Sequence, residues 1–234
     1  MKVIKFGGSS LADATHFNDV IQILRMDRQR RVVVVSAPGK RNENDEKVTD
    51  LLIEYARVHG KTQQSIGQKI IDRYQEIATA FNISAVQFKP LADQILALPT
   101  TSFRGPAFRM AAFKAHGEKL NAQLLALVLT TQGLSARYVD PHELGLIATQ
   151  EPNNATILSQ TYTHLAVARQ ELPAEDKLWV VPGFFAYTTS GQLVTFSRGG
   201  SDITGAILAR GLHATEYENF TDVDSIYAAN PNVV

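Results

Sequence analysis

The sequence predicts an α/β fold, a three-layer α/β/α sandwich around a mostly parallel central sheet. Short apolar runs alternate along the chain with longer segments of helical periodicity, as in chains built from βαβ units. One run holds four consecutive valines, Val32 to Val35, without polar alternation, which is typical of a strand covered on both faces. A strand and a helical segment precede it, so the two strands are expected to be parallel and joined by a right-handed crossover.

Length and composition limit the functions open to this chain. Its 234 residues contain no clear linker or repeat, so we expect one domain over residues 1–234. The 23 Lys and Arg residues balance 23 Asp and Glu residues, which gives no support for a nucleic acid or a membrane surface as partner. The absence of cysteine excludes disulfides, thiolate nucleophiles and cysteine metal sites. With no apolar run of membrane-spanning length, a soluble cytoplasmic protein is expected.

The first half of the chain is predicted to contain a βαβ unit followed by a long helical segment. Asp13 is a start signal for the first helix. The helical segment is interrupted near residues 59–60 and near Asn82, and it is expected to cover one end or one face of the sheet. The predicted elements are strands at 3–6 and 31–35, a loop at 40–46, helices across 48–98 and a long helix at 106–131.

The second half of the chain is predicted to return to alternating strands and helices. A Thr-Thr-Ser-Gly turn at residues 188–191 indicates a hairpin. The predicted elements are a strand at 136–139, a loop-rich stretch at 141–154, a helix at 158–172, a strand at 178–181, hairpin strands at 184–187 and 193–196, a helix from Ser201 or Asp202, and a strand at 214–222.

Residues 197–202, Ser-Arg-Gly-Gly-Ser-Asp, have the features of an anion site between a strand and a helix. Gly199 and Gly200 allow a ligand to approach the backbone closely, and the helix that follows directs free N–H groups to the same place. Arg198 adds a planar fork of donors suited to a carboxylate or a phosphate. Asp202 would repel an anion unless it holds a cation, so a lysine from elsewhere in the chain is expected beside it.

Lys5 lies at the end of the first strand and precedes the glycine pair Gly7 and Gly8, which makes this turn a candidate phosphate site. Ligands of open α/β sheets bind at such strand ends. The alternative interpretation is a plain strand-to-helix turn with a solvent-directed lysine. Neither a Walker A sequence nor GxGxxG occurs, so any phosphate site is of another kind. Residues 36–39, Ser-Ala-Pro-Gly, end the valine strand at the same edge.

Gly117 and Glu118 stand inside an otherwise apolar helix, where a glycine costs about 1 kcal/mol relative to alanine. Spacing alone favours close packing of Gly117 against a neighbouring helix, with Glu118 solvated. A functional carboxylate is the alternative. His116 beside them is expected to be structural, because no second histidine or carboxylate stands at a metal-binding interval.

Residues 221–227 follow the last predicted strand and contain several polar side chains. A calcium loop is excluded, because Ile226 stands where an oxygen ligand is required. Two interpretations remain, an ordinary turn and a loop that binds a nucleotide through a hydroxyl, a carboxylate and an aromatic ring.

Seven segments carry a resemblance to a known family. They are KFGGSS at 5–10, VSAPG at 35–39, KVTD at 47–50, HGEKL at 116–120, VPGF at 181–184, SRGGSD at 197–202 and TDVD at 221–224. In this order they resemble the aspartokinases, a branch of the amino acid kinase family with a carbamate kinase-like fold. The resemblance runs the entire length of the chain, which would make residues 1–234 an amino acid kinase catalytic domain.

The resemblance implies transfer of the γ-phosphate of ATP, bound with Mg²⁺, to the β-carboxylate of L-aspartate. The product would be 4-phospho-L-aspartate, the first step toward lysine, threonine and methionine. Lys5 would contact the transferred phosphoryl group, and Asp202 would orient Lys5. The other residues implied for ATP are Gly7, Gly8 and Ser9 at the phosphates and Thr221, Asp222 and Tyr227 at the adenosine.

On the acceptor side, the resemblance implies that Arg198 binds the α-carboxylate of aspartate and that Glu118 receives its ammonium group. The remaining acceptor-site residues would be Ser36, Thr49, Gly199, Gly200 and Ser201. A homo-oligomer is expected for the full-length form. Two alternatives remain, another amino acid kinase with a glutamate-type acceptor and a non-catalytic, truncated binding or assembly subunit.

The chain also departs from the pattern of the family. Ser9 stands where threonine is usual, Ser197 and Ser225 replace glycines, and Asn-Pro-Asn at 230–232 replaces Asp-Pro-Arg. Aspartokinases continue beyond the position of Val234 through the rest of the nucleotide subdomain and regulatory ACT domains. A truncated chain with negligible kinase activity by itself is therefore expected.

Overall fold

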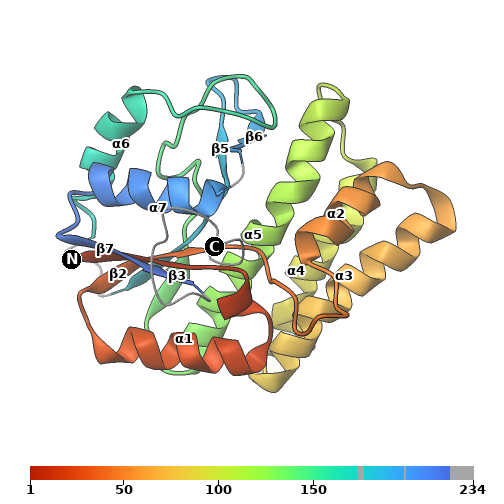
Figure 1. The fold of residues 1–234 in the computed structure, drawn as a ribbon, viewed down its shortest axis with the longest axis horizontal. Coiled ribbons are helices and arrows are strands. Elements are labelled where there is room, and N and C mark those ends of the chain that lie inside the picture. Colours follow the sequence, from red (N-terminus) through yellow and green to blue (C-terminus); the bar gives the residue numbers. More distant parts are fainter. Residues whose placement is uncertain (173–176, 198, 222–234) are drawn as a thin grey trace, which may run out of the picture.

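A five-stranded parallel sheet forms the centre of the computed structural model, which describes residues 1–172, 177–197 and 199–221 (Figure 1). Every pair of neighbouring strands in this sheet runs parallel. The strand order is β3-β4-β2-β1-β7. The strands are β1 Lys2–Phe6, β2 Arg30–Val35, β3 Ala136–Tyr138, β4 Leu178–Pro182 and β7 Glu216–Phe220.

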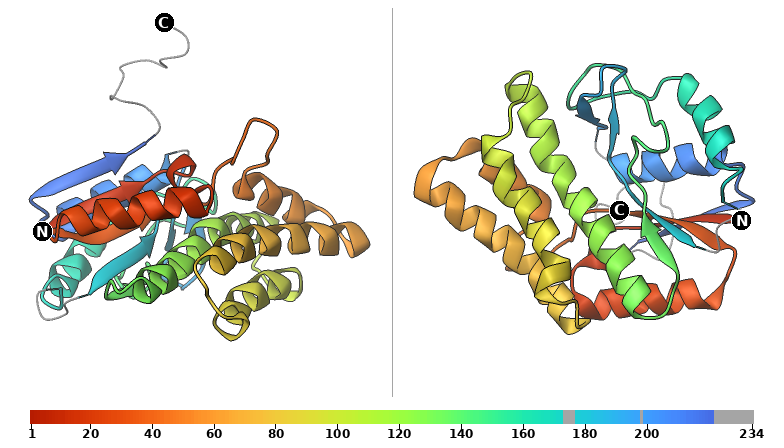
Figure 2. Two further views of the ribbon diagram at one scale, coloured as in Figure 1. Left: turned by 90° about the horizontal axis from the view of Figure 1, so that it is seen from below. Right: turned by 180° about the vertical axis from the view of Figure 1, so that it is seen from behind.

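Helices cover both faces of the sheet (Figures 1 and 2). In β2, Val33 and Val35 belong to the core on the side of α1 (Ala14–Met26) and α5 (Pro106–Thr131), while Val32 and Val34 belong to the core on the side of α6 (Gln160–Ala168) and α7 (Gly200–Gly211). The predicted three-layer sandwich is therefore confirmed. The helices are α1 Ala14–Met26, α2 Val48–Arg57, α3 Gly60–Ala80, α4 Ala85–Ala97, α5 Pro106–Thr131, α6 Gln160–Ala168 and α7 Gly200–Gly211, with short 3₁₀ turns at Ser9–Leu11 and Leu98–Thr100.

Local sequence signals explain several helix boundaries. The Asp13 carboxylate accepts a hydrogen bond from the His16 N–H at 3.1 Å, so the predicted start of α1 is confirmed. Ser84 and Gln87 form a capping box at the start of α4. The helices α2, α3 and α4 pack on one another and on α5, to the right of the sheet in Figure 1, so the helical segment expected at one end of the sheet is present.

The predicted hairpin is present, but its strands do not belong to the central sheet. β5, Phe185–Tyr187, and β6, Leu193–Thr195, pair with each other as an antiparallel sheet of their own. The strand that precedes the glycine turn at residues 199–200 therefore contributes to a small flanking sheet. Helix α6 is shorter than the predicted 158–172, since it ends at Ala168. After that residue the N–H groups of Gln170 and Glu171 bond to carbonyl oxygens three residues earlier, as in a turn. Among the described residues, no helix combines the length and the apolar character needed to cross a membrane.

Candidate active site

The turns that follow β1 and β2 interlock at the carboxyl edge of the sheet. The Gly39 N–H donates to the Gly8 carbonyl oxygen at 2.8 Å. A Cβ atom on Gly8 would lie 2.8 Å from the Ala37 oxygen, and one on Gly39 would lie 2.7 Å from the Gly8 carbonyl carbon, so neither position has room for a side chain. These close contacts hold the two turns together as one surface.

Gly7 and Gly8, the two glycines expected to offer N–H groups to phosphates, differ in whether the N–H group is already hydrogen-bonded. The Gly7 N–H donates to the Phe220 carbonyl oxygen at 3.1 Å and is already occupied, because β7 pairs with β1 up to this point. The Gly8 N–H forms no hydrogen bond with any residue that the structure describes. Gly8 is therefore the glycine whose N–H is available to a ligand.

Lys5 and Asp202 form the ion pair that the sequence predicts. The Lys5 Nζ lies 2.8 Å from the Asp202 Oδ1, with the lysine side chain 8% exposed and the aspartate side chain 47% exposed. Asn219, which stands opposite Lys5 in the register of β1 and β7, donates to the same Asp202 oxygen at 3.0 Å. Three elements, β1, β7 and the first turn of α7, thus fix one buried ammonium group at the edge of the sheet.

Helix α7 begins directly against the end of β4. Gly199 has φ +76°, a conformation that favours glycine, and α7 starts at the next residue. The Phe184 N–H donates to the Thr204 hydroxyl oxygen at 3.0 Å, which ties the chain after β4 to the first turns of α7. Ser201 is buried in this junction. Arg198, the predicted carboxylate ligand, lies outside the described residues.

Helix α5 approaches the turn after β2 through Gly117. A Cβ atom on Gly117 would lie 2.7 Å from the Cβ of Ala37 and 3.3 Å from a methyl carbon of Leu52 in α2, so the glycine permits close packing against both a strand-end turn and a neighbouring helix. The Asn121 side chain, one turn later in α5, donates to the Ser36 carbonyl oxygen at 2.7 Å. The predicted close packing of Gly117 against a neighbouring helix is therefore present, and the turn after β2 packs there as well.

Glu118 is buried, and the expectation that it is solvated is wrong. The residue is 6% exposed, because α5 packs against the turn that contains Ala37. Burial raises the pKa of Glu118 to about 8, and hydrogen bonds from the backbone of Ala37 and of Glu118 oppose this shift. The Glu118 Oε2 has no hydrogen-bond partner among the described residues. A buried carboxylate with a vacant oxygen is suited to receive a cationic group.

The other predicted site residues lie around the same edge or outside the described residues. Thr49 is half-buried in the first turn of α2, whose start is tied to the turn after β2 by a 3.3 Å bond from the Val48 N–H to the Pro38 oxygen. Ser9 and Ser36 are half-buried in the interlocked turns, and Thr221 is exposed after β7. Asp222 and Tyr227, predicted at the nucleotide, lie outside the described residues.

Two residues contribute to this region although no sequence motif includes them. Asn121 holds the turn after β2, and Asn219 holds Asp202. A signal for Asn121 exists in the sequence, because Lys114, Glu118 and Asn121 are spaced along one face of an otherwise apolar helix. His116 is structural, as expected: its Nδ1 lies 2.7 Å from the Ala112 carbonyl oxygen, and burial lowers its pKa to about 4.

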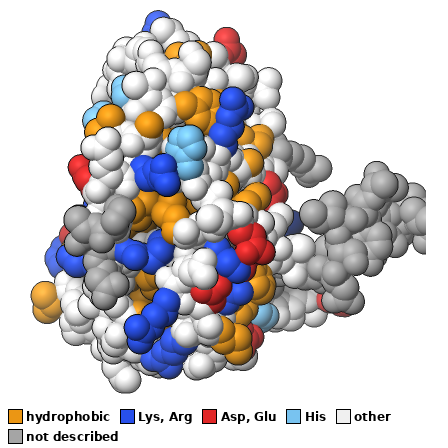
Figure 3. All heavy atoms as spheres, turned by 90° about the vertical axis from the view of Figure 1, so that its left-hand side faces the viewer, with side chains coloured by type: hydrophobic (Ala, Val, Ile, Leu, Met, Phe, Trp, Pro, Cys, Tyr) orange, Lys and Arg blue, Asp and Glu red, His pale blue; other side chains and the backbone are white. Residues whose placement is uncertain are grey.

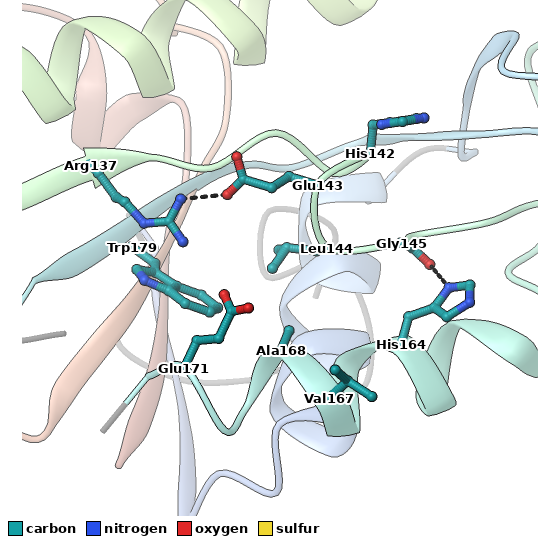
Figure 4. A pocket seen from close by; sticks show the side chains of 10 residues that line it. All are labelled: Arg137, His142, Glu143, Leu144, Gly145, His164, Val167, Ala168, Glu171 and Trp179. Carbon is teal, nitrogen blue, oxygen red and sulfur yellow. Dashed lines mark hydrogen bonds and ion pairs between the residues drawn. The ribbon is translucent and has the colours of Figure 1, made fainter. Parts of the chain in front are cut away.

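Two pockets lie away from these residues. A pocket of about 370 Å³ between the β3–β4 edge and α6 contains an Arg137–Glu143 ion pair and a 3.0 Å contact of the His164 ring with the Gly145 oxygen (Figure 4). A second pocket, of about 410 Å³, opens near the amino ends of β2 and β4 and is lined by several Lys and Arg residues. Lys and Arg side chains are spread over the face of the molecule shown in Figure 3. None of the predicted site residues lines either pocket.

Comparison with known proteins agrees with this geometry. Residues 1–234 match the model of the amino acid kinase family. The chain is 42% identical to aspartokinase 3 of Bacillus subtilis, over 100% of this chain and 51% of that protein. It superimposes on the structure of Clostridium acetobutylicum aspartate kinase with a TM-score of 0.76 and 32% identity, covering 100% of this chain and 50% of that chain.

A second similar structure is that of Escherichia coli aspartokinase III in complex with aspartate and ADP. The TM-score is 0.84 at 26% identity, covering 100% of this chain and 52% of that chain. The chain thus spans about half the length of the relatives that it matches. A family match over every residue, together with the sheet order and the strand-end turns, shows that this chain belongs to the amino acid kinase family.

Proposed function

We propose that this chain forms the acceptor side of an aspartokinase, which transfers the γ-phosphoryl group of ATP to the β-carboxylate of L-aspartate. The observation that carries the proposal is the buried Glu118 carboxylate with its vacant oxygen, next to the turn that also contacts Gly8. The similarity to an aspartokinase solved with aspartate and ADP supports the same substrates here. The product, 4-phospho-L-aspartate, would enter lysine, threonine and methionine synthesis in the cytoplasm, made by a homo-oligomeric enzyme.

Glu118 determines how the acceptor is oriented. A substrate ammonium group at the vacant Oε2 supplies the hydrogen-bond donor that this buried carboxylate lacks when no amino acid is bound. An acylated amino group would bring no charge to this position. Arg198 would bind the α-carboxylate, and the remaining contacts to the acceptor would come from Ser36, Thr49, Gly199, Gly200 and Ser201.

Lys5 determines where negative charge is stabilised. Its ammonium group is held by Asp202 at the edge where the free Gly8 N–H also lies, so both donors are in place before a phosphoryl group arrives. Mg²⁺ carried by the nucleotide would neutralise further phosphate charge. Gly7 and Ser9 would complete the phosphate contacts, and Thr221, Asp222 and Tyr227 would contact the adenosine.

The proposed reaction needs little covalent help from the protein. The β-carboxylate of aspartate is ionised near neutral pH, so no general base has to remove a proton from the attacking oxygen. In phosphoryl transfer, alignment of the two substrates and neutralisation of charge account for most of the rate. Glu118 aligns the acceptor, and the Lys5–Asp202 pair supplies a fixed cation for the transferred group.

The test is a hydroxylamine assay, which traps the acyl phosphate as a hydroxamate. Because the chain spans 51% of Bacillus subtilis aspartokinase 3, the assay uses a chimera in which the second half of that protein continues this chain. We expect hydroxamate that depends on both L-aspartate and Mg-ATP, and none from the second half alone. A chimera that binds aspartate without forming hydroxamate, or that accepts glutamate equally well, would contradict the proposed function.

A further inference from the structure

The side chain of Lys114, on α5, ends in an ammonium group that the proposed mechanism does not use. It lies one helical turn before Glu118 and is half-buried. Its Nζ lies 5.5 Å from the centre of the Phe184 ring, and it forms no hydrogen bond or ion pair with any described residue. Burial lowers the pKa of Lys114, and the nearby Glu118 carboxylate opposes that shift. The three N–H donors of this side chain are therefore unused.

The position of Phe184 places Lys114 beside the acceptor site. Phe184 follows β4 with φ 75°, a strained conformation for a residue with a bulky side chain. A Cβ atom on Gly200 would lie 2.6 Å from the Phe184 ring, so this ring packs directly on the start of α7. Lys114 thus lies where α5, the end of β4 and the beginning of α7 meet.

The spacing of Lys114 and Glu118 matches the two charges of an amino acid. The α-ammonium and the α-carboxylate are attached to the same carbon, so the groups that bind them must be close together. Residues four positions apart lie on the same face of a helix, with Cβ atoms roughly 5–6 Å apart. Once Glu118 ionises, its carboxylate and the Lys114 ammonium group therefore lie on one helix face, where one amino acid can contact both.

We propose that Lys114 binds the α-carboxylate of the acceptor amino acid together with Arg198 and is a specificity-determining residue of this site. This inference rests on the proposed function, because it takes Glu118 as the receptor of the substrate ammonium group. Arg198 lies outside the described residues. Lys114 contributes a cation from the α5 side of the acceptor site. The Lys114 ammonium group itself lies over the Phe184 ring at this junction, 5.5 Å from the ring centre.

A structural role for Lys114 makes a different prediction. If the side chain only packs on the Phe184 ring, an uncharged side chain of similar length replaces it without loss of binding. Lys114→Met keeps the packing and removes the charge, so it separates the two roles. Lys89→Met is the matched control, because Lys89 is an exposed lysine on α4 that pairs with Asp93.

The experiment titrates the chain and both variants with two ligands, L-aspartate and its α-amide, in which the α-carboxylate is replaced by a neutral amide. We expect Lys114→Met to weaken aspartate binding about 10- to 100-fold, as for loss of a charge-assisted contact. Its affinity for the α-amide should equal that of the unchanged chain. Lys89→Met should bind both ligands as the unchanged chain does, and thermal unfolding checks that all three proteins are folded.

Each other outcome overturns the inference. Unchanged aspartate affinity in a folded Lys114→Met would show that Lys114 only packs on Phe184, and the proposed function would stand. Equal weakening for aspartate and for the α-amide would mean that Lys114 does not contact the α-carboxylate. If the unchanged chain bound neither ligand, the proposed acceptor site itself would be wrong, and the role of Lys114 with it.

Discussion

The Lys5→Met variant of the chimera is expected to lose about 10²- to 10³-fold in kcat for hydroxamate formation, the range found when one charge-stabilising donor is removed. Lys5 is the buried cation at the carboxyl edge of β1, and Asp202 and Asn219 fix its position. Because it stabilises charge that develops during transfer, its loss should affect kcat more than the KM for aspartate. Methionine fills a similar volume, so the fold should be retained.

Lys2→Met is the matched control for this result. Lys2 lies on the same strand at the opposite edge of the sheet, where it pairs with Asp27, Glu216 and Glu218. Its loss changes stability but should leave kcat unaltered. Asp202→Asn should lower kcat less than Lys5→Met, because the ammonium group remains while its orientation is lost. Wild-type kcat in a folded Lys5→Met variant would remove Lys5 from the proposed mechanism.

The Glu118→Gln variant is expected to bind L-aspartate at least about 30-fold more weakly, which corresponds to about 2 kcal/mol or more for a buried charge that loses its partner. Glutamine keeps the shape of the side chain but cannot pair with an ammonium group. The affinity of the chain for nucleotide should be unchanged, since Glu118 lies on the acceptor side. Isothermal titration with aspartate and with ADP measures both quantities.

The same variant should be more stable than the unchanged chain. The folded-state pKa of Glu118, about 8, lies above the ordinary value of 4.5, so the contribution of Glu118 to the free energy of unfolding is most favourable below pH 4.5 and falls as pH rises toward 8. Glutamine does not titrate, so the free energy of unfolding of Glu118→Gln relative to that of the unchanged chain should increase across that window. Weaker binding together with higher stability cannot result from a damaged fold. An unaltered affinity for aspartate would show that Glu118 is not the ammonium receptor.

The sequence predicts the central sheet because its signal is local. The run Val32 to Val35 has no polar face, and the structure covers both of its faces with helices. A cation beside Asp202 is also predictable, since an aspartate in an anion-binding turn requires one, and the resemblance to aspartokinases identifies it as Lys5. Neither the buried strand nor the need for a cation beside Asp202 depends on knowing which distant segments come into contact.

The burial of Glu118 is not predictable in the same way. Helical spacing gives the face on which a residue lies, but it does not show that the turn containing Ala37 packs against Gly117. The assignment of β5 and β6 to a separate sheet likewise depends on tertiary packing, because a hairpin has the same sequence pattern in either sheet. Contacts between segments distant in the chain decide both features.

Proton release on aspartate binding tests the central claim most directly. With a pKa of about 8, Glu118 is mostly protonated at pH 7 in the free chain, and it must ionise to pair with a substrate ammonium group. Isothermal titrations at pH 7 in buffers of different ionisation enthalpy should therefore show release of up to about 0.9 proton per aspartate bound, and none for Glu118→Gln. Aspartate binding without proton release, or with equal release by Glu118→Gln, would contradict the assignment of Glu118 as the receptor of the acceptor amino acid.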